Sequence, residues 1–306
     1  MSKKTALYII PTLLIISAGI IVSFIVFFAP KQPNISNVVP KGDNNMYQYT
    51  YLDNDYEFAL YLPDSTPSCE GYPLVIMLHG YSGNAESFRL QTHFDENACK
   101  RGYVVAYMTC SAGSSTSSTD AGWNSGLGNS DKDDLGLITA LAKYLQKEYN
   151  CSKDLTFVVG FSNGAFMAQR LAAEANDTFT AVASVAGMMP QSIWEARKDK
   201  QDVGVLEIYG TLDDVVPKNA DNSAATSVAP AIEDVMNYWV YSNNLTDFST
   251  GELSKKAVLT QYYNDKNDNF VWTVVINDGH HSWPDEKFCG FSVNDLILDF
   301  FDQYLK

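Results

Sequence analysis

A serine between two glycines is the first residue in this sequence whose setting points to chemistry. It is Ser162, in the stretch GFSNG (160–164), where an apolar strand-like run gives way to apolar residues at helical spacing. Glycines on both sides remove side chains that would collide in a sharp strand-to-helix turn, so the hydroxyl would stand above a sheet and could act as a nucleophile. A serine that caps the helix fits the same pattern, and residues elsewhere must decide between the two.

A serine nucleophile needs a base, and the base needs a group that orients it. His280 and His281 come directly after the apolar run FVWTVVIND, and Asp213 and Asp214 come soon after VLEIYG. Both pairs follow Ser162 in the order serine, acid, histidine, which is the order found when the serine lies on a strand–turn–helix corner. Acids at strand ends are often plain turn residues, but their place one strand before the histidines favours a catalytic carboxylate.

A tetrahedral intermediate would also need backbone N–H groups that hold its negative oxygen. One is expected from Asn163, the residue after the serine, and another from the loop HGYSG after the strand YPLVIML. In that loop Gly80 and Gly83 allow a tight turn, and the N–H of Tyr81 is the best candidate donor. His79 is expected to brace this loop rather than to act as a base.

Strand-like and helical runs alternate along the chain and must position these residues. Strands are expected at YPLVIMLHG, YVVAYM, LTFVVGF, AVASVAG, VGVLEIYG and FVWTVVIND, after a hairpin around residues 53–55. One helix is expected over 85–102, with His93 in its interior. This alternation predicts an α/β fold with a mostly parallel sheet and helices on both faces. Ligands bind such sheets beyond the carboxyl ends of the strands, where the serine, acids and histidines fall.

The N-terminal segment is apolar and carries no charge between Lys4 and Lys31. Its 24 residues from 6 to 29 would span about 36 Å as a helix, enough to cross a bilayer, and no cleavage site of the small-x-small kind follows. The lysine distribution places the N-terminus in the cytoplasm and the bulk of the chain outside. A secreted protein with a cleaved signal peptide is the alternative. The expected order is a cytoplasmic tip (1–5), a transmembrane signal-anchor helix (6–29), a stalk (30–46) and a catalytic domain (47–306).

Charge and cysteine content exclude some classes of function. The formal net charge of −15 disfavours binding to nucleic acid, and no basic stripe is present. No CxxC or His/Cys spacing suggests a metal, and no cofactor or obligate protein partner is implied. Outside the cytoplasm disulfides are permitted, but the sequence does not reveal how the cysteines pair. The five cysteines are Cys69, Cys99, Cys110, Cys151 and Cys289.

Five stretches, taken in order, resemble a known family. They are PLVIMLHGYSGNAESF, DDLGLITAL, VVGFSNGAFMAQRLAAE, YGTLDDVVP and HHSWP, and they span roughly 47–306. The chain resembles α/β-hydrolases of the carbohydrate-esterase family one and polyhydroxybutyrate-depolymerase group, which includes feruloyl and acetylxylan esterases. The resemblance implies an eight-stranded α/β-hydrolase sheet and an esterase without a cofactor. The resemblance implies that Ser162 is the nucleophile, that His281 is the base and that Asp213 is the acid that orients the base.

Two departures from the family pattern concern the acyl pocket and the base. The family usually has glycine where His280 stands, and the loop GYSG differs from the commoner small-residue loop. Trp123 and Trp283 fall in loops near the carboxyl ends of the strands, where they could form an aromatic wall for the substrate. Buried loop anchors are an equal alternative for both tryptophans.

Together these features predict a membrane-anchored, extracellular serine esterase. The expected substrates are feruloyl or acetyl esters on plant cell-wall polysaccharide, or small esters. A polyhydroxybutyrate or other short-chain polyester depolymerase, a lipid esterase and a peptidase are alternatives with the same catalytic groups. A catalytically inactive hydrolase fold that serves as a surface binding module is an alternative of another class.

Overall fold

An 11-stranded sheet with six parallel strands at its centre organises the fold. The structure is a computed structural model, and it describes residues 34–42, 45–110, 122–128, 130–216 and 229–305. All of these belong to the second of the two units into which the chain divides, residues 34–306. In sheet order the parallel strands are β5 (Val104–Met108), β4 (Tyr72–Leu78), β6 (Cys151–Phe161), β7 (Ala181–Val185), β8 (Gly204–Gly210) and β11 (Val271–Ile276).

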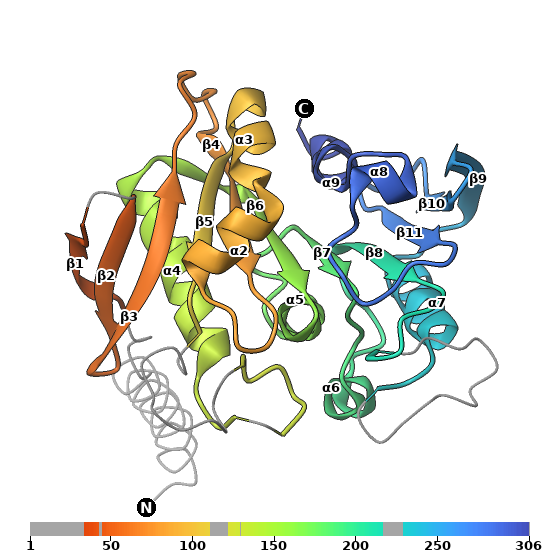
Figure 1. Ribbon diagram of the computed structural model, residues 1–306, viewed down its shortest axis with the longest axis horizontal. Helices are drawn as coiled ribbons and strands as arrows, with labels where there is room; N and C mark the ends of the chain where they lie inside the picture. The colour runs from red at the N-terminus through yellow and green to blue at the C-terminus, as the bar shows by residue number, and fades with distance from the viewer. Residues whose placement is uncertain (1–33, 43–44, 111–121, 129, 217–228, 306) are drawn as a thin grey trace, which may run out of the picture. The chain divides into compact units, whose positions relative to one another are not determined.

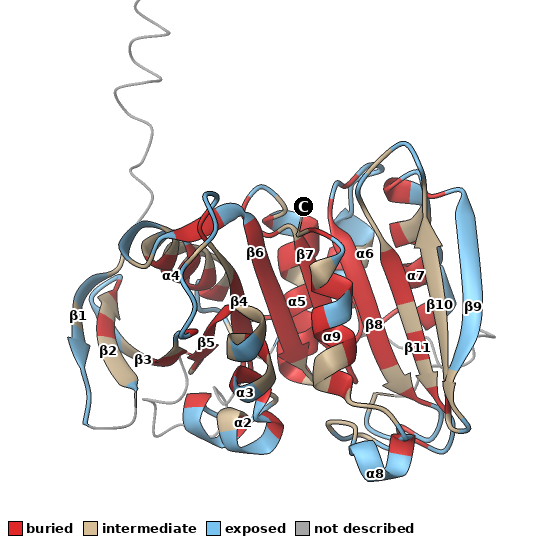
Figure 2. Cartoon of the chain, turned by 90° about the horizontal axis from the view of Figure 1, so that it is seen from above, coloured by how far each residue is buried: buried red, intermediate tan, exposed pale blue. Residues whose placement is uncertain are grey.

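Antiparallel strands extend the sheet at both edges. Beyond β5 lie β3 (Asn54–Tyr61), β2 (Met46–Tyr51) and β1 (Ser36–Pro40), and beyond β11 lie β10 (Ala257–Tyr263) and β9 (Asp247–Ser254). Figure 2 shows that buried residues concentrate in the central strands, whereas β1 and β9 at the two edges are exposed.

Helices cover both faces of the sheet and bury one apolar core on each (Figure 1). One face carries α4 (Asp134–Glu148), α5 (Asn163–Glu174) and α7 (Ile232–Ser242). The other carries α2 (Ala85–Thr92), α3 (Phe94–Ala98) and α9 (Val293–Asp302). Shorter pieces are η1 (Cys99–Arg101), α6 (Gln191–Ala196) and α8 (Glu286–Cys289). The predicted α/β class with helices on both faces is confirmed.

The prediction of a mostly parallel sheet of eight strands is wrong, because antiparallel edge strands make the described sheet a mixed one of 11 strands. The hairpin β9–β10 was not predicted, since β9 (DFSTGELS) is almost entirely exposed and lacks a buried apolar face. Part of the predicted stalk at 30–46 is also a strand: in β1, Val39 pairs with Gln48 and Pro40 with Tyr47. Backbone pairing to an exposed edge leaves little trace in the apolar pattern, so neither strand stood out.

The predicted membrane segment cannot be compared with this architecture. The cytoplasmic tip (1–5) and the signal-anchor helix (6–29) lie outside the described residues. Within the described ranges, no helix combines the length and apolarity needed to cross a membrane.

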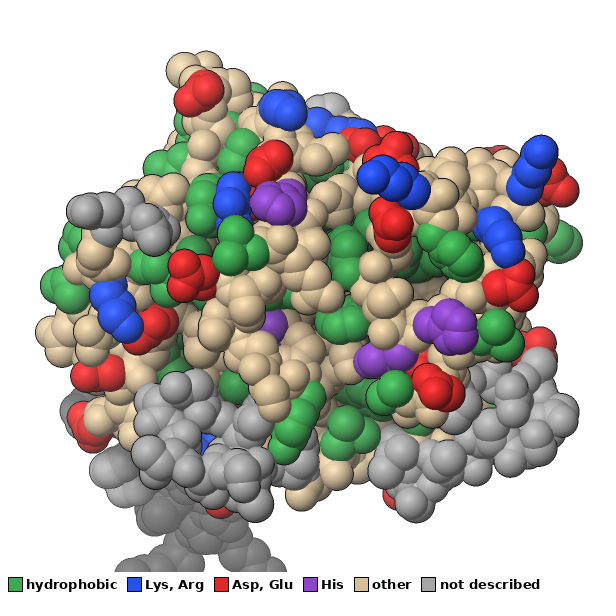
Figure 3. All heavy atoms as spheres, viewed as in Figure 1, with side chains coloured by type: hydrophobic (Ala, Val, Ile, Leu, Met, Phe, Trp, Pro, Cys, Tyr) green, Lys and Arg blue, Asp and Glu red, His purple; other side chains and the backbone are tan. Residues whose placement is uncertain are grey.

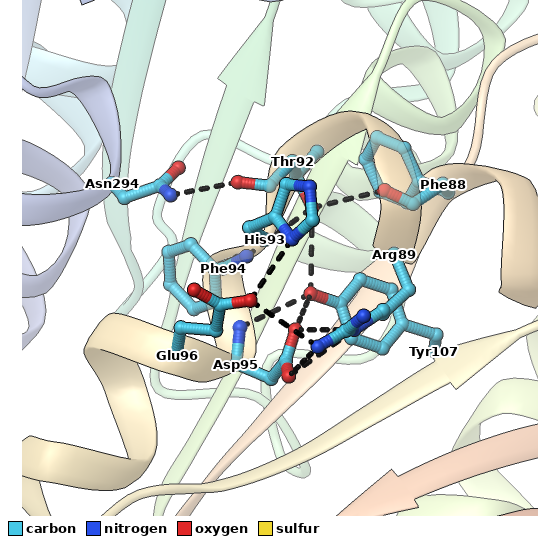
Figure 4. Close-up of polar contacts among 9 residues, drawn as sticks. All are labelled: Phe88, Arg89, Thr92, His93, Phe94, Asp95, Glu96, Tyr107 and Asn294. Atoms are coloured by element: carbon cyan, nitrogen blue, oxygen red, sulfur yellow. Dashed lines mark hydrogen bonds and ion pairs between the residues drawn. The ribbon is translucent and has the colours of Figure 1, made fainter. Parts of the chain in front are cut away.

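The helix predicted over 85–102 breaks at His93, which is therefore not in a helix interior. His93 adopts left-handed backbone angles (φ 47°), and its N–H donates to Arg89 O at 2.8 Å to end α2. Just beyond the break, buried Asp95 accepts hydrogen bonds from the Arg89 guanidinium at 3.1–3.3 Å and from Tyr107 Oη at 3.0 Å (Figure 4). The bonds to Tyr107 join α3 to β5 beyond the break.

Candidate active site

Ser162 lies at the corner between β6 and α5 in a strained backbone conformation. Its φ of 52° and ψ of −117° lie outside the regions that L-residues favour. A Cβ at Gly160 would stand 2.0 Å from Gly164 O, and one at Gly164 would stand 2.2 Å from Leu78 O. Both positions therefore require glycine, because neighbouring backbone lies too close to admit a Cβ atom. The Ser162 side chain makes no capping bond to α5, which removes the capping alternative.

The structure brings Ser162, Asp213 and His281 together. His281 Nε2 lies 2.9 Å from Ser162 Oγ, and His281 Nδ1 lies 2.9 Å from Asp213 Oδ2. The three residues come from the ends of β6, β8 and β11, where carboxyl ends of parallel strands share one edge. The neighbouring alternatives, Asp214 and His280, are exposed instead.

Asp213 is held as an ionised hydrogen-bond acceptor. Its side chain is fully buried, and Oδ1 accepts the N–H groups of Val215 and Val216 at 3.0 and 2.8 Å. Burial alone would raise the pKa of this carboxyl, but the hydrogen bonds from His281 and the two amides outweigh it, and the pKa is lowered below its ordinary value. Since an ionised carboxylate can only accept, Nδ1 of His281 must donate, which leaves Nε2 free to accept the serine proton.

The loop after β4 passes directly against the serine corner. A Cβ at Gly80 would stand 3.3 Å from Ser162 Cβ and 3.0 Å from the Phe161 ring, and Gly83 N–H closes the turn on Gly80 O at 3.1 Å. Asn163 is the first residue of α5, where an amide has no carbonyl partner within its helix. Tyr81 lies in the loop, so both predicted oxyanion donors belong to segments that flank Ser162; their role stays a prediction.

His79 is buried and neutral, and it holds the loop as the sequence suggests. Its Nε2 accepts the N–H of Cys110 at 3.1 Å, so Nδ1 carries the proton and donates to Gly80 O at 2.6 Å. Burial lowers the pKa of His79 to about 4. A ring with both nitrogens engaged and no contact to Ser162 is a brace and not a base.

The two tryptophans differ, and the expectation of an aromatic substrate wall is wrong for Trp123. Trp123 has no exposed surface, so a substrate cannot reach it. Trp283 is half-buried, and its ring meets those of Phe88 and Phe161 edge-on at 5.6 and 6.3 Å. Phe161 in turn lies 5.4 Å from the His281 ring. Phe161 and Trp283 therefore belong to an aromatic cluster beside His281. Contact of Trp283 with substrate stays a prediction.

Exposed apolar side chains lie next to Asp213 in the chain, and the sequence analysis did not single them out. Leu212 and Val215, on either side of Asp213, are exposed by 49% and 64%, and Tyr81 by 52%. Hydrophobic side chains also lie beside the histidines on the face shown in Figure 3. A cavity of about 190 Å³ opens under the loop that carries His281, with His280 and Phe288 in its lining. The signal was present in the motif TLDDVVP, whose apolar residues flank the acid.

The described residues contain no metal site and no disulfide. Among them no group of three or more His, Cys, Asp or Glu side chains is arranged to hold a metal ion. All five cysteines are described, and none of them forms a disulfide. Burial raises the pKa of Cys99 and of Cys151 to about 12, so neither is poised as a nucleophile.

Comparison with known proteins decides the family. The Esterase family model, described as "Putative esterase", matches residues 50–284. The chain belongs to this esterase family.

The relatives carry related names but align over only part of their length. "Putative esterase NocK" of Nocardia uniformis subsp. tsuyamanensis is 34% identical over 53% of this chain and 46% of its own. "Probable feruloyl esterase C" of Aspergillus clavatus is 26% identical over 76% of this chain and 78% of its own. The chain spans about half the length of NocK and one fifth of the bifunctional acetylxylan esterase/xylanase of Neocallimastix patriciarum.

A solved structure supports the fold. The acetyl xylan esterase from Aspergillus awamori superposes with a TM-score of 0.59 over 88% of this chain and 99% of that one. At 13% sequence identity, this likeness bears on the fold alone.

Proposed function

We propose that this esterase cleaves acyl esters with Ser162 as nucleophile, His281 as general base and Asp213 as the carboxylate that orients the base. The observation that carries the proposal is the pair of 2.9 Å contacts that joins the three side chains at a strained corner. Nucleophile, base and orienting group within hydrogen-bond reach is the geometry that serine hydrolysis requires.

The reaction follows from this geometry. His281 Nε2 takes the proton as Ser162 Oγ attacks the ester carbonyl, and Asp213 stabilises the imidazolium that forms. The N–H groups of Asn163 and Tyr81 hold the oxyanion. His281 then protonates the leaving alcohol, and water, activated by the same imidazole, releases the acid from the acyl-enzyme.

We propose feruloyl or acetyl esters on plant cell-wall polysaccharide as the substrates. The names of several relatives and the apolar surroundings of Asp213 support this choice, because an uncharged acyl group fits exposed Leu212 and Val215. We further propose that residues 6–29 anchor the esterase in the membrane with its catalytic domain outside the cell, on the grounds of the uncharged run in the sequence.

A substrate panel tests this proposal. Methyl ferulate, acetylated xylan, hydroxybutyrate oligomers and p-nitrophenyl acetate would each be offered to the full chain and to Ser162→Ala. We expect hydrolysis of the first two by the wild type and none by the variant. Turnover of hydroxybutyrate oligomers alone would indicate a polyester depolymerase. No turnover of any ester by folded wild type would favour a binding module and contradict the proposal.

A further inference from the structure

We propose that Trp123 is a positioning residue that locks the loop after β4 to the nucleophile corner and so aligns the two oxyanion donors. This inference rests on the proposed function, and it gives a buried tryptophan that substrate cannot reach a role in the reaction. Trp123 belongs to the short segment Gly122–Ser125, here called the brace segment, which lies between β5 and α4 in the sequence.

The indole of Trp123 holds the loop. Its Nε1–H donates to the backbone carbonyl of His79 at 2.9 Å, and the two rings lie 5.0 Å apart. His79 is the residue at which the oxyanion loop leaves β4, and its own ring is already fixed by Gly80 O and Cys110 N–H. The indole therefore anchors the loop two residues before Tyr81.

The backbone of Trp123 holds the nucleophile corner. The Asn163 side chain accepts the Trp123 N–H at 2.6 Å, and its amide donates to Ser125 Oγ at 3.1 Å and to Trp123 O at 3.4 Å. Asn163 is also the residue whose own N–H is expected to bind the oxyanion. One tryptophan thus bonds through its indole to the segment that carries one donor, and through its main chain to the residue that carries the other.

The brace segment is itself fixed to two helices. Asn124 O accepts Arg170 of α5 at 2.6 Å, and Asn124 N–H donates to the buried Asp134 of α4 at 2.6 Å. A Cβ at Gly122 would stand 2.7 Å from Asn163 Oδ1 and 2.8 Å from the Tyr81 ring, so Tyr81 packs against the brace segment as well. A segment tied to α4 and α5 has little freedom to move relative to Ser162.

Oxyanion donors stabilise the transition state only when they are aligned in advance. Loss of a whole donor typically costs 10²–10³ in kcat. Without the indole N–H of Trp123, the loop after β4 would lose its anchor, and the donors would be present but misplaced. We therefore expect Trp123→Phe to lower kcat by about 10- to 100-fold. The ground-state ester is held mainly by other contacts, and KM should change by less than about threefold.

Trp239→Phe is the matched control. Trp239 is as buried as Trp123, and its indole N–H also donates a hydrogen bond, to Gln169 Oε1 at 2.8 Å. Trp239, however, lies in α7 and not beside the loop after β4. Both variants should lose similar stability in urea. The kcat on p-nitrophenyl acetate and the affinity for an arylboronic acid, which mimics the tetrahedral intermediate, should fall together in Trp123→Phe and remain near wild type in Trp239→Phe.

A second variant keeps the inference testable if Trp123→Phe fails to fold. Asn163→Ala retains the backbone donor but removes the bonds to Trp123 and Ser125, and it should lower kcat and boronate affinity in the same proportion. Equal losses of kcat in Trp123→Phe and Trp239→Phe, or a Trp123→Phe variant within twofold of wild type, would overturn the inference while leaving the proposed function intact. A wild type that hydrolyses no ester and binds no boronate would overturn both.

Discussion

Among single residues, two adjacent acids, Asp213 and Asp214, could orient the base. Asp213 is buried and bonded to His281, whereas Asp214 is exposed. Asp213→Asn should lower kcat by about 10⁴-fold, because an amide in place of the carboxylate favours the wrong imidazole tautomer. Asp214→Asn should change kcat less than twofold. Steady-state assays of both variants on one ester check this, and the reverse ranking would move the acid by one position.

The same comparison separates the two histidines. His281 contacts Ser162 Oγ, while His280 is exposed at the rim of the neighbouring cavity. His281→Ala should lower kcat by about 10⁴-fold or more, because the base that accepts the serine proton is lost. His280→Gly, which restores the residue usual in the family, should remain within a few-fold of wild type. An active His281→Ala beside a dead His280→Ala would show that the base is misassigned.

At the scale of elements, the turn after β4 makes stability depend on pH. Burial depresses the pKa of His79 from 6.5 to about 4, so between these values the unfolded chain binds a proton that the native protein does not. The contribution of His79 to the free energy of unfolding is therefore fully present above pH 6.5. It is lost as the pH falls toward 4, by about 3 kcal/mol in total.

Urea unfolding of wild type and His79→Gln at pH 7 and pH 5 measures this contribution. We expect the variant to be less stable at pH 7 but to lose less stability on acidification, because glutamine does not titrate. Carboxylates elsewhere titrate in both proteins and cancel in the difference. Parallel pH dependences would mean that His79 is not the neutral brace of this turn.

The corner between α2 and α3 should contribute strongly to stability. Asp95 is 4% exposed and accepts Arg89 and Tyr107 together (Figure 4). Asp95→Ala leaves Arg89 without its buried partner and should cost about 3 kcal/mol in the free energy of unfolding. Glu96→Ala, in an exposed pair with the same arginine at 3.4 Å, should cost less than about 1 kcal/mol. Equal costs would contradict the assignment of Asp95 as the centre of this corner.

These elements also show how far the sequence can predict the structure. The central strands and the meeting of Ser162, Asp213 and His281 could be predicted, because buried parallel strands leave continuous apolar runs and the motifs fall at their ends. The break at His93 could not, because it depends on the hydrogen bonds between Asp95 and Tyr107 of β5, two residues that lie 12 apart in sequence. The burial of Trp123 depends in the same way on Asn163 and His79, and a sequence shows neither contact.

In the whole molecule, the sheet brings the proposed catalytic groups together at the carboxyl ends of its parallel strands. Six parallel strands end together there, and their loops supply Ser162, Asp213, His281 and the expected oxyanion donors. The antiparallel strands extend the sheet on both sides without contributing to the triad. The net charge of −15 keeps the surface acidic, which favours solubility and disfavours anionic substrates.

The central claim, that Ser162 is the nucleophile, is tested most directly by a covalent label. The purified protein would be treated with a fluorophosphonate, digested and analysed by mass spectrometry. The account predicts one adduct per chain on the peptide that contains Ser162, with labelling and ester hydrolysis both lost in Ser162→Ala. An adduct on another residue, or ester hydrolysis that persists in folded Ser162→Ala, would contradict it.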